Sequence, residues 1–264
     1  MTTLTEADRK ELILARHILE NPGIAARITN FIGMPIEKGF DMLPKNWSDK
    51  IGVITKTALE KASDAALFTI KDIPGKDSSN VWHKLAVATS GGVGGFFGFT
   101  GLAIELPVST TIILRSIADI ARSQGETVTD IETKLACMEV LALGGESEED
   151  DAAESGYYLT RGVLAKSLAD AAKHIAQRGF VEEGAPVLVK FFANIATRYG
   201  VTVSNKVAAQ AVPVIGAVGG AAVNTLFMDH FQDMARGHFI VRKLERKYGQ
   251  EVIRELYEKN QGGE

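Results

Sequence analysis

Apolar positions recur along most of this chain with the period of an α-helix. Leu12, Ala15 and Leu19, for example, fall at the spacing that lines one face of a helix. The alternation of apolar and polar residues that would indicate strands is hard to find anywhere. The pattern therefore predicts an all-α helical bundle. Helices are expected over residues 3–19, 24–32, 48–70, 81–89, 131–143, 157–178, 186–199 and, after a turn at Gly200, 201–220, with one helix through 111–122 and a long one from 221.

Local signals indicate where some of these helices begin and end. Thr3 and Glu6 have the spacing of a capping box, in which side chains satisfy free backbone amides at a helix N-terminus. Gly125 is expected to close the helix through 111–122, because glycine adopts the left-handed conformation that ends helices. Thr129 or Asp130 is expected to cap the next helix.

Two long stretches rich in glycine and alanine carry no charge, Leu85–Ile104 and Val207–Met228. Each is long enough to cross a membrane. Both are poor in leucine, isoleucine and phenylalanine, however, and Pro107 and Pro213 would interrupt a spanning helix. Glycines at helical spacing let two helix backbones approach closely. We therefore expect two buried helical hairpins, with a spanning helix and reversible membrane insertion as the alternatives.

A short pattern follows each of these stretches. Residues 111–122 read T-I-I-L-R-S-I-A-D-I-A-R and residues 225–236 read T-L-F-M-D-H-F-Q-D-M-A-R, with Thr, Asp, Ala and Arg at the same offsets. The recurrence predicts two similar hairpin units related by a pseudo-twofold axis.

Positions i, i+4 and i+7 share one face of a helix, and in both copies this face is charged. It holds Arg115, Asp119 and Arg122 in the first copy and Asp229, Asp233 and Arg236 in the second. Asp119–Arg122 and Asp233–Arg236 are predicted as local i,i+3 pairs. Arg115 is expected to face Asp229 or Asp233 across the axis. Such a network either fixes the register between central helices or forms a polar site at the centre of the bundle.

Glu105 lies in apolar surroundings just before Pro107. A carboxylate buried there without a partner would cost several kcal/mol. We expect it to meet an arginine or an amide from elsewhere, such as Gln210 or Asn224, or to be protonated.

Candidate catalytic and metal-binding groups are sparse. His230, Asp233 and Glu105 could supply ligands for a metal in a helical bundle, but the first copy of the repeated pattern has no histidine. The chain contains neither the H-E-x-x-H zinc motif nor the G-x-S-x-G nucleophile motif. His230 and Asp233 are therefore only weak metal candidates, and we expect no metal and no cofactor.

Composition narrows the function classes. The 264 residues have a net charge of −4, which disfavours a nucleic-acid surface because such surfaces are basic. Cys137 is the single cysteine, fits a reducing compartment and is expected to be an inert core thiol. Residues 1–11 lack the apolar core of a signal peptide. We expect a cytoplasmic protein.

Three segments resemble the EcsC protein family. They read E-L-P-V-S-T-T-I-I-L-R-S-I-A-D-I-A-R (Glu105–Arg122), E-S-G-Y-Y-L-T-R (Glu154–Arg161) and A-A-Q-A-V-P-V-I-G-A-V-G-G-A-A-V-N-T-L-F-M-D-H-F-Q-D-M-A-R-G-H-F (Ala208–Phe239). The resemblance runs from about Asn21 to Tyr248 and implies one helical domain over 1–264, with a family-like core over 21–248 and a polar tail over 249–264. The positions of the family pattern are Glu105, Pro107, Arg115, Asp119, Arg122, Tyr157, Arg161, Gln210, Pro213, Asn224, Asp229, His230, Asp233, Arg236 and His238.

The family takes its name from a gene beside those of an ABC-transporter ATPase and permease, and the resemblance implies a bacterial protein without assigning a reaction. We expect a non-enzymatic factor on the cytosolic side of the inner membrane, whose partner is lipid or a transporter component. The alternatives are an interaction scaffold and a metal- or acid/base-dependent hydrolase that uses Glu105, Asp229, His230 and Asp233. Neither the substrate nor the oligomeric state follows from the sequence.

Overall fold

The computed structural model describes residues 4–20, 24–33, 35–68, 98–143, 156–178, 185–212 and 216–259. In these residues the chain is helical and contains no strand, which confirms the predicted all-α class. The elements are α1 (Glu6–Leu19), α2 (Ile24–Ile32), α3 (Glu37–Asp41), α4 (Trp47–Ser63), the π-helix η1 (Asp64–Phe68), α6 (Gly98–Ser123), α7 (Ile131–Glu139), the 3-10 turn η2 (Val140–Ala142), α8 (Gly156–Arg178), α9 (Pro186–Ala211), α10 (Gly216–Tyr248) and α11 (Gln250–Lys259).

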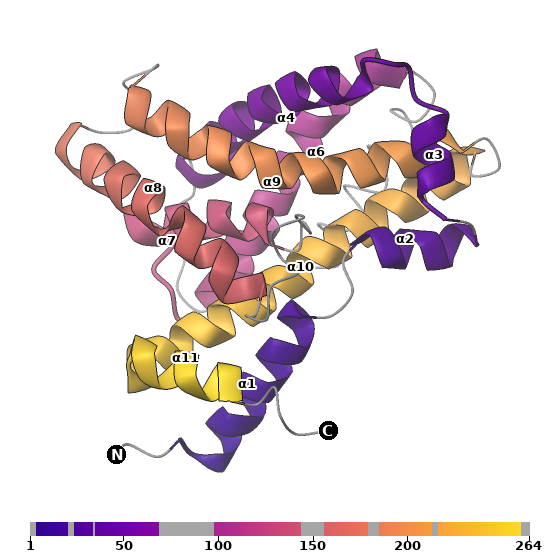
Figure 1. The fold of residues 1–264 in the computed structure, drawn as a ribbon. Coiled ribbons are helices and arrows are strands. Elements are labelled where there is room, and N and C mark those ends of the chain that lie inside the picture. Colours follow the sequence, from indigo (N-terminus) through magenta and orange to yellow (C-terminus); the bar gives the residue numbers. More distant parts are fainter. Residues whose placement is uncertain are drawn as a thin grey trace.

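The longest helix, α10, runs diagonally through the molecule (Figure 1). It packs against α1, α6, α9 and α11, while α4 packs against both α6 and α9. The aromatic rings of Tyr199, Phe227 and Phe231 meet where α9 and α10 touch, with centroids 5.1–6.2 Å apart. Burial of these large side chains on α9 and α10 favours folding, because apolar burial dominates the free energy of folding.

The first and last helices lie together at the end of α10 (Figure 1). Gly237 lets α1 come close to α10, since a Cβ atom there would lie 2.6 Å from Cγ of Leu19. Residues 250–259 form α11, whose Ile253 and Tyr257 are buried. The sequence predicts a polar tail over 249–264, but part of this segment is a helix that buries two side chains against the rest of the protein.

The helix ends follow local chemistry, with one correction. Gly125 ends α6 with a φ of 83°, and Asp130 occupies the N-cap position of α7, as predicted, although its side chain makes no capping hydrogen bond. The predicted capping box lies two residues too early in the chain. Helix α1 begins at Glu6 with Thr5 as its N-cap, and the Thr5 hydroxyl accepts a hydrogen bond from the Asp8 amide at 3.2 Å.

Two expected helix breaks are absent. Helix α6 continues through Pro107, which removes the hydrogen bond to the carbonyl of Ala103. Ala103 is exposed, so water can take the place of that bond. Helix α9 continues through Gly200, since an interior glycine costs only about 1 kcal/mol and buried Tyr199 and Val203 anchor the helix on both sides.

The two uncharged stretches can be compared with the structure only in part. The second contributes to α9 and α10, which pack against each other as the predicted hairpin requires, although α10 already starts at Gly216. Most of the first stretch and the helix expected over 81–89 lie outside the described residues. Cys137 is buried, and burial raises the pKa of its thiol. The pseudo-twofold axis stays a prediction.

Candidate functional site

Glu105 forms a buried ion pair with Lys206. Glu105 lies on α6, and Lys206 on α9 donates to both of its carboxylate oxygens at 2.9 and 3.0 Å. The Lys206 side chain is fully buried, and its ammonium lies 4.8 Å from the ring centroid of Phe227. Two charges that would each be costly alone thus satisfy one another inside the core.

The amide partners expected for Glu105 bind each other instead. Gln210 on α9 donates to the side-chain oxygen of Asn224 on α10 at 3.4 Å. Asn224 is buried and Gln210 is half-buried. The expectation that one of these amides meets Glu105 is therefore wrong, although both lie on helices of the predicted hairpin.

The local pairs of the repeated pattern form as predicted. Arg122 donates to Asp119 at 2.6 Å and Arg236 donates to Asp233 at 2.8 Å. Thr111 and Thr225, which open the two copies, also behave alike, because each hydroxyl donates to the carbonyl four residues earlier. These likenesses are local to each helix.

Contacts between the copies differ from the expected network. Arg115 is exposed and donates to the backbone carbonyl of Ala65 in η1 at 3.2 Å, so it does not pair with Asp229 or Asp233. A buried, neutral hydrogen bond joins α10 to α6, in which the Gln232 amide donates to the Ser116 hydroxyl at 2.9 Å.

Asp233 has a partner that the sequence did not indicate. Arg27 on α2 donates to its second carboxylate oxygen at 2.9 Å. Asp233 therefore joins α2 to α10 and also accepts from Arg236 on its own helix. Asp229 lies one turn earlier on α10 and is half-buried. It also has an interaction partner in the structure.

His230 is buried between these charged residues. Burial lowers the pKa of its imidazole to about 4, the positive charge of Arg27 adds to this effect, and Asp233 opposes it. The imidazole is consequently neutral at pH 7. No group of three or more histidine, cysteine or acidic side chains suited to a metal occurs among the described residues.

A second polar network lies in the core where α8 meets α10. Arg161 forms a two-point ion pair with Glu245 at 2.7 and 3.1 Å, and the Tyr157 hydroxyl lies 3.1 Å from Nδ1 of His238. The other imidazole nitrogen is 3.8 Å from the carboxylate of Glu139. Burial raises the pKa of Glu139 and lowers that of His238. In each case burial works against the charged form of the group.

A third cluster is centred on Glu126, in the turn after α6. Arg242 and Arg246, one helical turn apart on α10, both donate to its carboxylate, and Arg242 does so at 2.9 Å. The Thr133 hydroxyl on α7 donates to the second oxygen at 3.2 Å. Burial raises the pKa of Glu126, but the hydrogen bond and charge of Arg242 and the charge of Arg246 outweigh this, so the net shift is downward.

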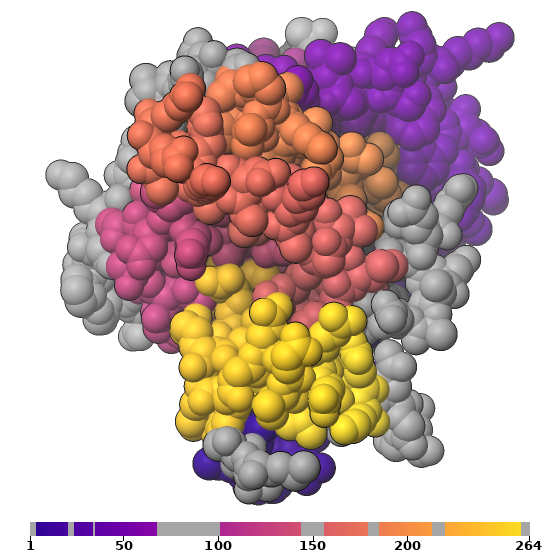
Figure 2. All heavy atoms as spheres, turned by 60° about the vertical axis from the view of Figure 1, so that its left-hand side comes forward, coloured from indigo at the N-terminus to yellow at the C-terminus, as the bar shows by residue number. Residues whose placement is uncertain are grey.

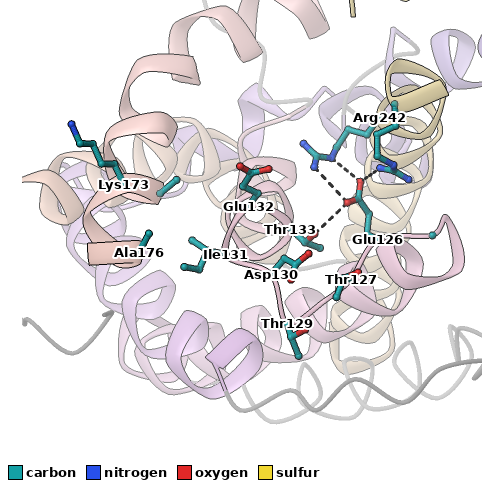
Figure 3. Close-up of a pocket in the computed structure, with 13 residues that line it drawn as sticks. Glu126, Thr127, Thr129, Asp130, Ile131, Glu132, Thr133, Lys173, Ala176 and Arg242 are labelled. Atoms are coloured by element: carbon teal, nitrogen blue, oxygen red, sulfur yellow. Dashed lines mark hydrogen bonds and ion pairs between the residues drawn. The ribbon is translucent and has the colours of Figure 1, made fainter. Parts of the chain in front are cut away.

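This cluster forms one wall of an open cleft of about 850 Å³. In Figure 3 Arg242, Thr133 and Glu126 lie at one end, Asp130 and Glu132 lie between, and Lys173 and Ala176 of α8 lie at the other end. Figure 2 shows the face on which α7, α8 and the yellow C-terminal helices meet. The lining residues are Gly125, Glu126, Thr127, Thr129, Asp130, Ile131, Glu132, Thr133, Ala172, Lys173, Ala176, Arg242 and Arg246.

The residues predicted to form one central polar cluster therefore belong to several separate contacts. Glu105 joins α6 to α9, Gln210 and Asn224 join α9 to α10, and Asp233 joins α10 to α2. Lys206 could have been found from the sequence, because it is the single charged residue between Arg198 and Asp229, just as Glu105 is the single one between Lys84 and Arg115. No comparable signal pointed to Arg27 or to the Glu126 cluster.

Comparison with known proteins gives one family match. A search of curated proteins and a search of solved structures each find no match. The model of the EcsC protein family matches residues 8–244, which include Glu105, the repeated pattern, Glu126 and Arg242. Because this match covers most of the 264 residues, the chain belongs to the EcsC protein family.

Proposed function

We propose that this protein is a non-enzymatic membrane-associated factor on the cytosolic side of the inner membrane, accessory to a membrane transporter. The first half of α6 is the segment that contacts lipid. The observation that carries the proposal is the outward face of this half, where Ile104 is 70% exposed and Val108, one turn later, is 49% exposed.

The charge distribution on α6 supports this proposal. Glu105 is the single charged residue from Gly98 to Leu114, and it turns inward to Lys206. The exposed side of the segment is left apolar. By length and composition, the part of α6 from Gly101 to Ser123 could also cross a membrane, but 61% of its most apolar window is buried. We therefore propose contact with the interface of the bilayer and not a spanning helix.

The expected strength of such contact is modest. Transfer of a large aliphatic side chain from water to an apolar phase gains about 1.5–3 kcal/mol when the side chain is fully buried. Two partly exposed side chains give weak, reversible binding, comparable to that of other peripheral segments with a small apolar face. A transporter component at the membrane would add the remaining affinity.

The hydrolase hypothesis has less support, because its residues belong to different contacts. Glu105 binds Lys206, while His230 lies near Asp233 and Arg27. Glu105 is thus committed to a buried structural ion pair, and no contact links it to His230 among the described residues.

Vesicle flotation tests the proposal. The full-length protein should float with liposomes of mixed phosphatidylglycerol and phosphatidylethanolamine, and Ile104→Asp/Val108→Asp should reduce the floated fraction at least fivefold. Val163→Asp on α8 is the matched control, because Val163 is 53% exposed but lies on another helix, and it should float like the wild type. Equal flotation of the double variant and the wild type, or no flotation of either, would contradict the proposal.

A further inference from the structure

The Glu126 cluster has the composition of a receptor for an anion. Two guanidinium groups and one hydroxyl, from α10 and α7, converge on a single carboxylate. Paired arginines with a hydroxyl are the groups that bind carboxylates and phosphates through short charge-assisted hydrogen bonds. Here the carboxylate belongs to the chain itself and opens onto a cleft.

Local geometry fixes the backbone of Glu126 and leaves its side chain as the movable part. The Gly125 amide bonds to the Arg122 carbonyl and the Glu126 amide to the Ala121 carbonyl, the pattern in which a left-handed glycine closes a helix. Rotation about the side-chain bonds of Glu126 would thus release both arginines without any movement of the main chain.

The charges at this end of the cleft do not balance. Arg242 and Arg246 carry two positive charges against the single negative charge of Glu126, and the Arg246 side chain is 42% exposed. A phosphate monoester carries about −1.5 to −2 at pH 7, so it matches the two arginines better than one carboxylate does. Asp130 and Glu132 lie farther along the cleft and would repel an anion there, which favours the arginine end for the phosphate.

We infer that the cleft binds a phosphate monoester at Arg242 and Arg246, and that Glu126 occupies this site as an internal substitute when the ligand is absent. The ligand's phosphate takes the hydrogen bonds that Glu126 now accepts, and the Glu126 side chain turns toward solvent. The phosphate is either that of a soluble metabolite or the headgroup of a phosphatidic-acid-like lipid, which present the same chemistry. This inference does not depend on α6 touching a membrane.

Removal of the internal carboxylate tests the inference. Glu126→Gln should bind inorganic phosphate at least tenfold more tightly than the wild type in calorimetric titrations at pH 7.5 and low salt, and the added change Arg246→Met should abolish that gain. Glu245→Gln is the matched control, because it neutralises a carboxylate that is likewise held at two points by an arginine but does not line the cleft. A gain in this control equal to that of Glu126→Gln would overturn the inference.

Vesicles separate the two sources of phosphate. A gain by Glu126→Gln for inorganic phosphate alone identifies a soluble ligand, and a gain for vesicles with phosphatidic acid but not for pure phosphatidylcholine identifies a lipid headgroup. No gain with either probe overturns the inference. If Glu126→Gln fails to fold, phosphate added to the wild-type protein should shift the side-chain Nε–Hε NMR signals of Arg242 and Arg246 but not that of Arg161. Unchanged signals would then refute it.

Discussion

Helix α6 carries two ion pairs that differ in their access to water. Glu105 meets Lys206 on another helix, and both side chains are almost completely buried. Asp119 meets Arg122 three residues later on the same helix, and these side chains keep partial access to solvent, with 23% and 12% of their surface exposed. The first pair depends on the whole bundle, whereas the second forms wherever the helix forms.

The two pairs should therefore contribute differently to stability. A local pair with access to solvent gains less because water screens its charges, while loss of one partner from a fully buried pair leaves a charge in the core. The repeated pattern attracts attention in the sequence, but its local pairs are energetically minor. The single lysine in the apolar half of α9 matters more.

The largest expected effect follows removal of the buried lysine. Lys206→Met should lower the free energy of unfolding by about 3–5 kcal/mol, because Glu105 would stay buried without its partner. Urea denaturation followed by circular dichroism measures this change. The double variant Lys206→Met/Glu105→Leu should recover most of the loss, since it removes both charges. A loss below about 1 kcal/mol in the single variant would mean that burial does not distinguish the two pairs.

A pH titration compares the buried imidazole of His230 with the same group in the unfolded chain. Its pKa of about 4 in the folded state is below the value of 6.5, so the unfolded state binds more protons between these values. This contribution to stability is complete above pH 6.5 and is lost as the pH falls toward 4. Between pH 7 and pH 5 the wild type should lose about 2 kcal/mol more than His230→Gln. Parallel pH dependence of the two proteins in urea denaturation would refute this.

Asp233 should be intermediate, because it is half-buried and has one local and one distant arginine. Asp233→Asn should cost about 1 kcal/mol of unfolding free energy. A double-mutant cycle with Arg27→Met should give a coupling of about 0.5 kcal/mol or more, as expected for side chains in contact. Additive effects of the two changes would show that the link between α2 and α10 contributes nothing.

The smallest effect is expected at Asp119. Asp119→Asn should change the free energy of unfolding by no more than about 0.5 kcal/mol, because Arg122 stays partly solvated when its partner is neutralised. The same denaturation experiment in 0.5 M NaCl should leave the difference unchanged or smaller. A loss as large as that of Lys206→Met would reverse the order of the two pairs.

Features set by neighbouring residues could be predicted from the sequence. The helical class, the glycine that ends α6, the cap at Asp130 and the i,i+3 pairs all depend on spacing within one helix. Proline and glycine were weaker guides. Pro107 and Gly200 do not interrupt their helices, because packing of the flanking turns outweighs a local cost of a few kcal/mol.

Partners from distant parts of the chain were mostly missed. The sequence predicts that Arg115 faces the second copy of the pattern, but Arg115 bonds to Ala65, and no pattern in the sequence connects Arg27 with Asp233. Which side chains of two helices meet depends on the crossing angle and axial offset of those helices, and neither is encoded in the spacing within one segment. A buried charge needs a neutralising partner, and this requirement can relate residues that are far apart in the sequence. For Glu105 it indicates Lys206.

The burial of α11 has a practical consequence for expression. The family match stops at residue 244, while Tyr257 on α11 packs against Tyr158 and its hydroxyl donates to Glu20 at 2.8 Å. A protein shortened to the matched residues would lack Tyr257, expose the rings of Tyr157 and Tyr158 that pack against it, and become prone to aggregation. Affinity tags and crystallisation trims should accordingly be placed beyond Lys259.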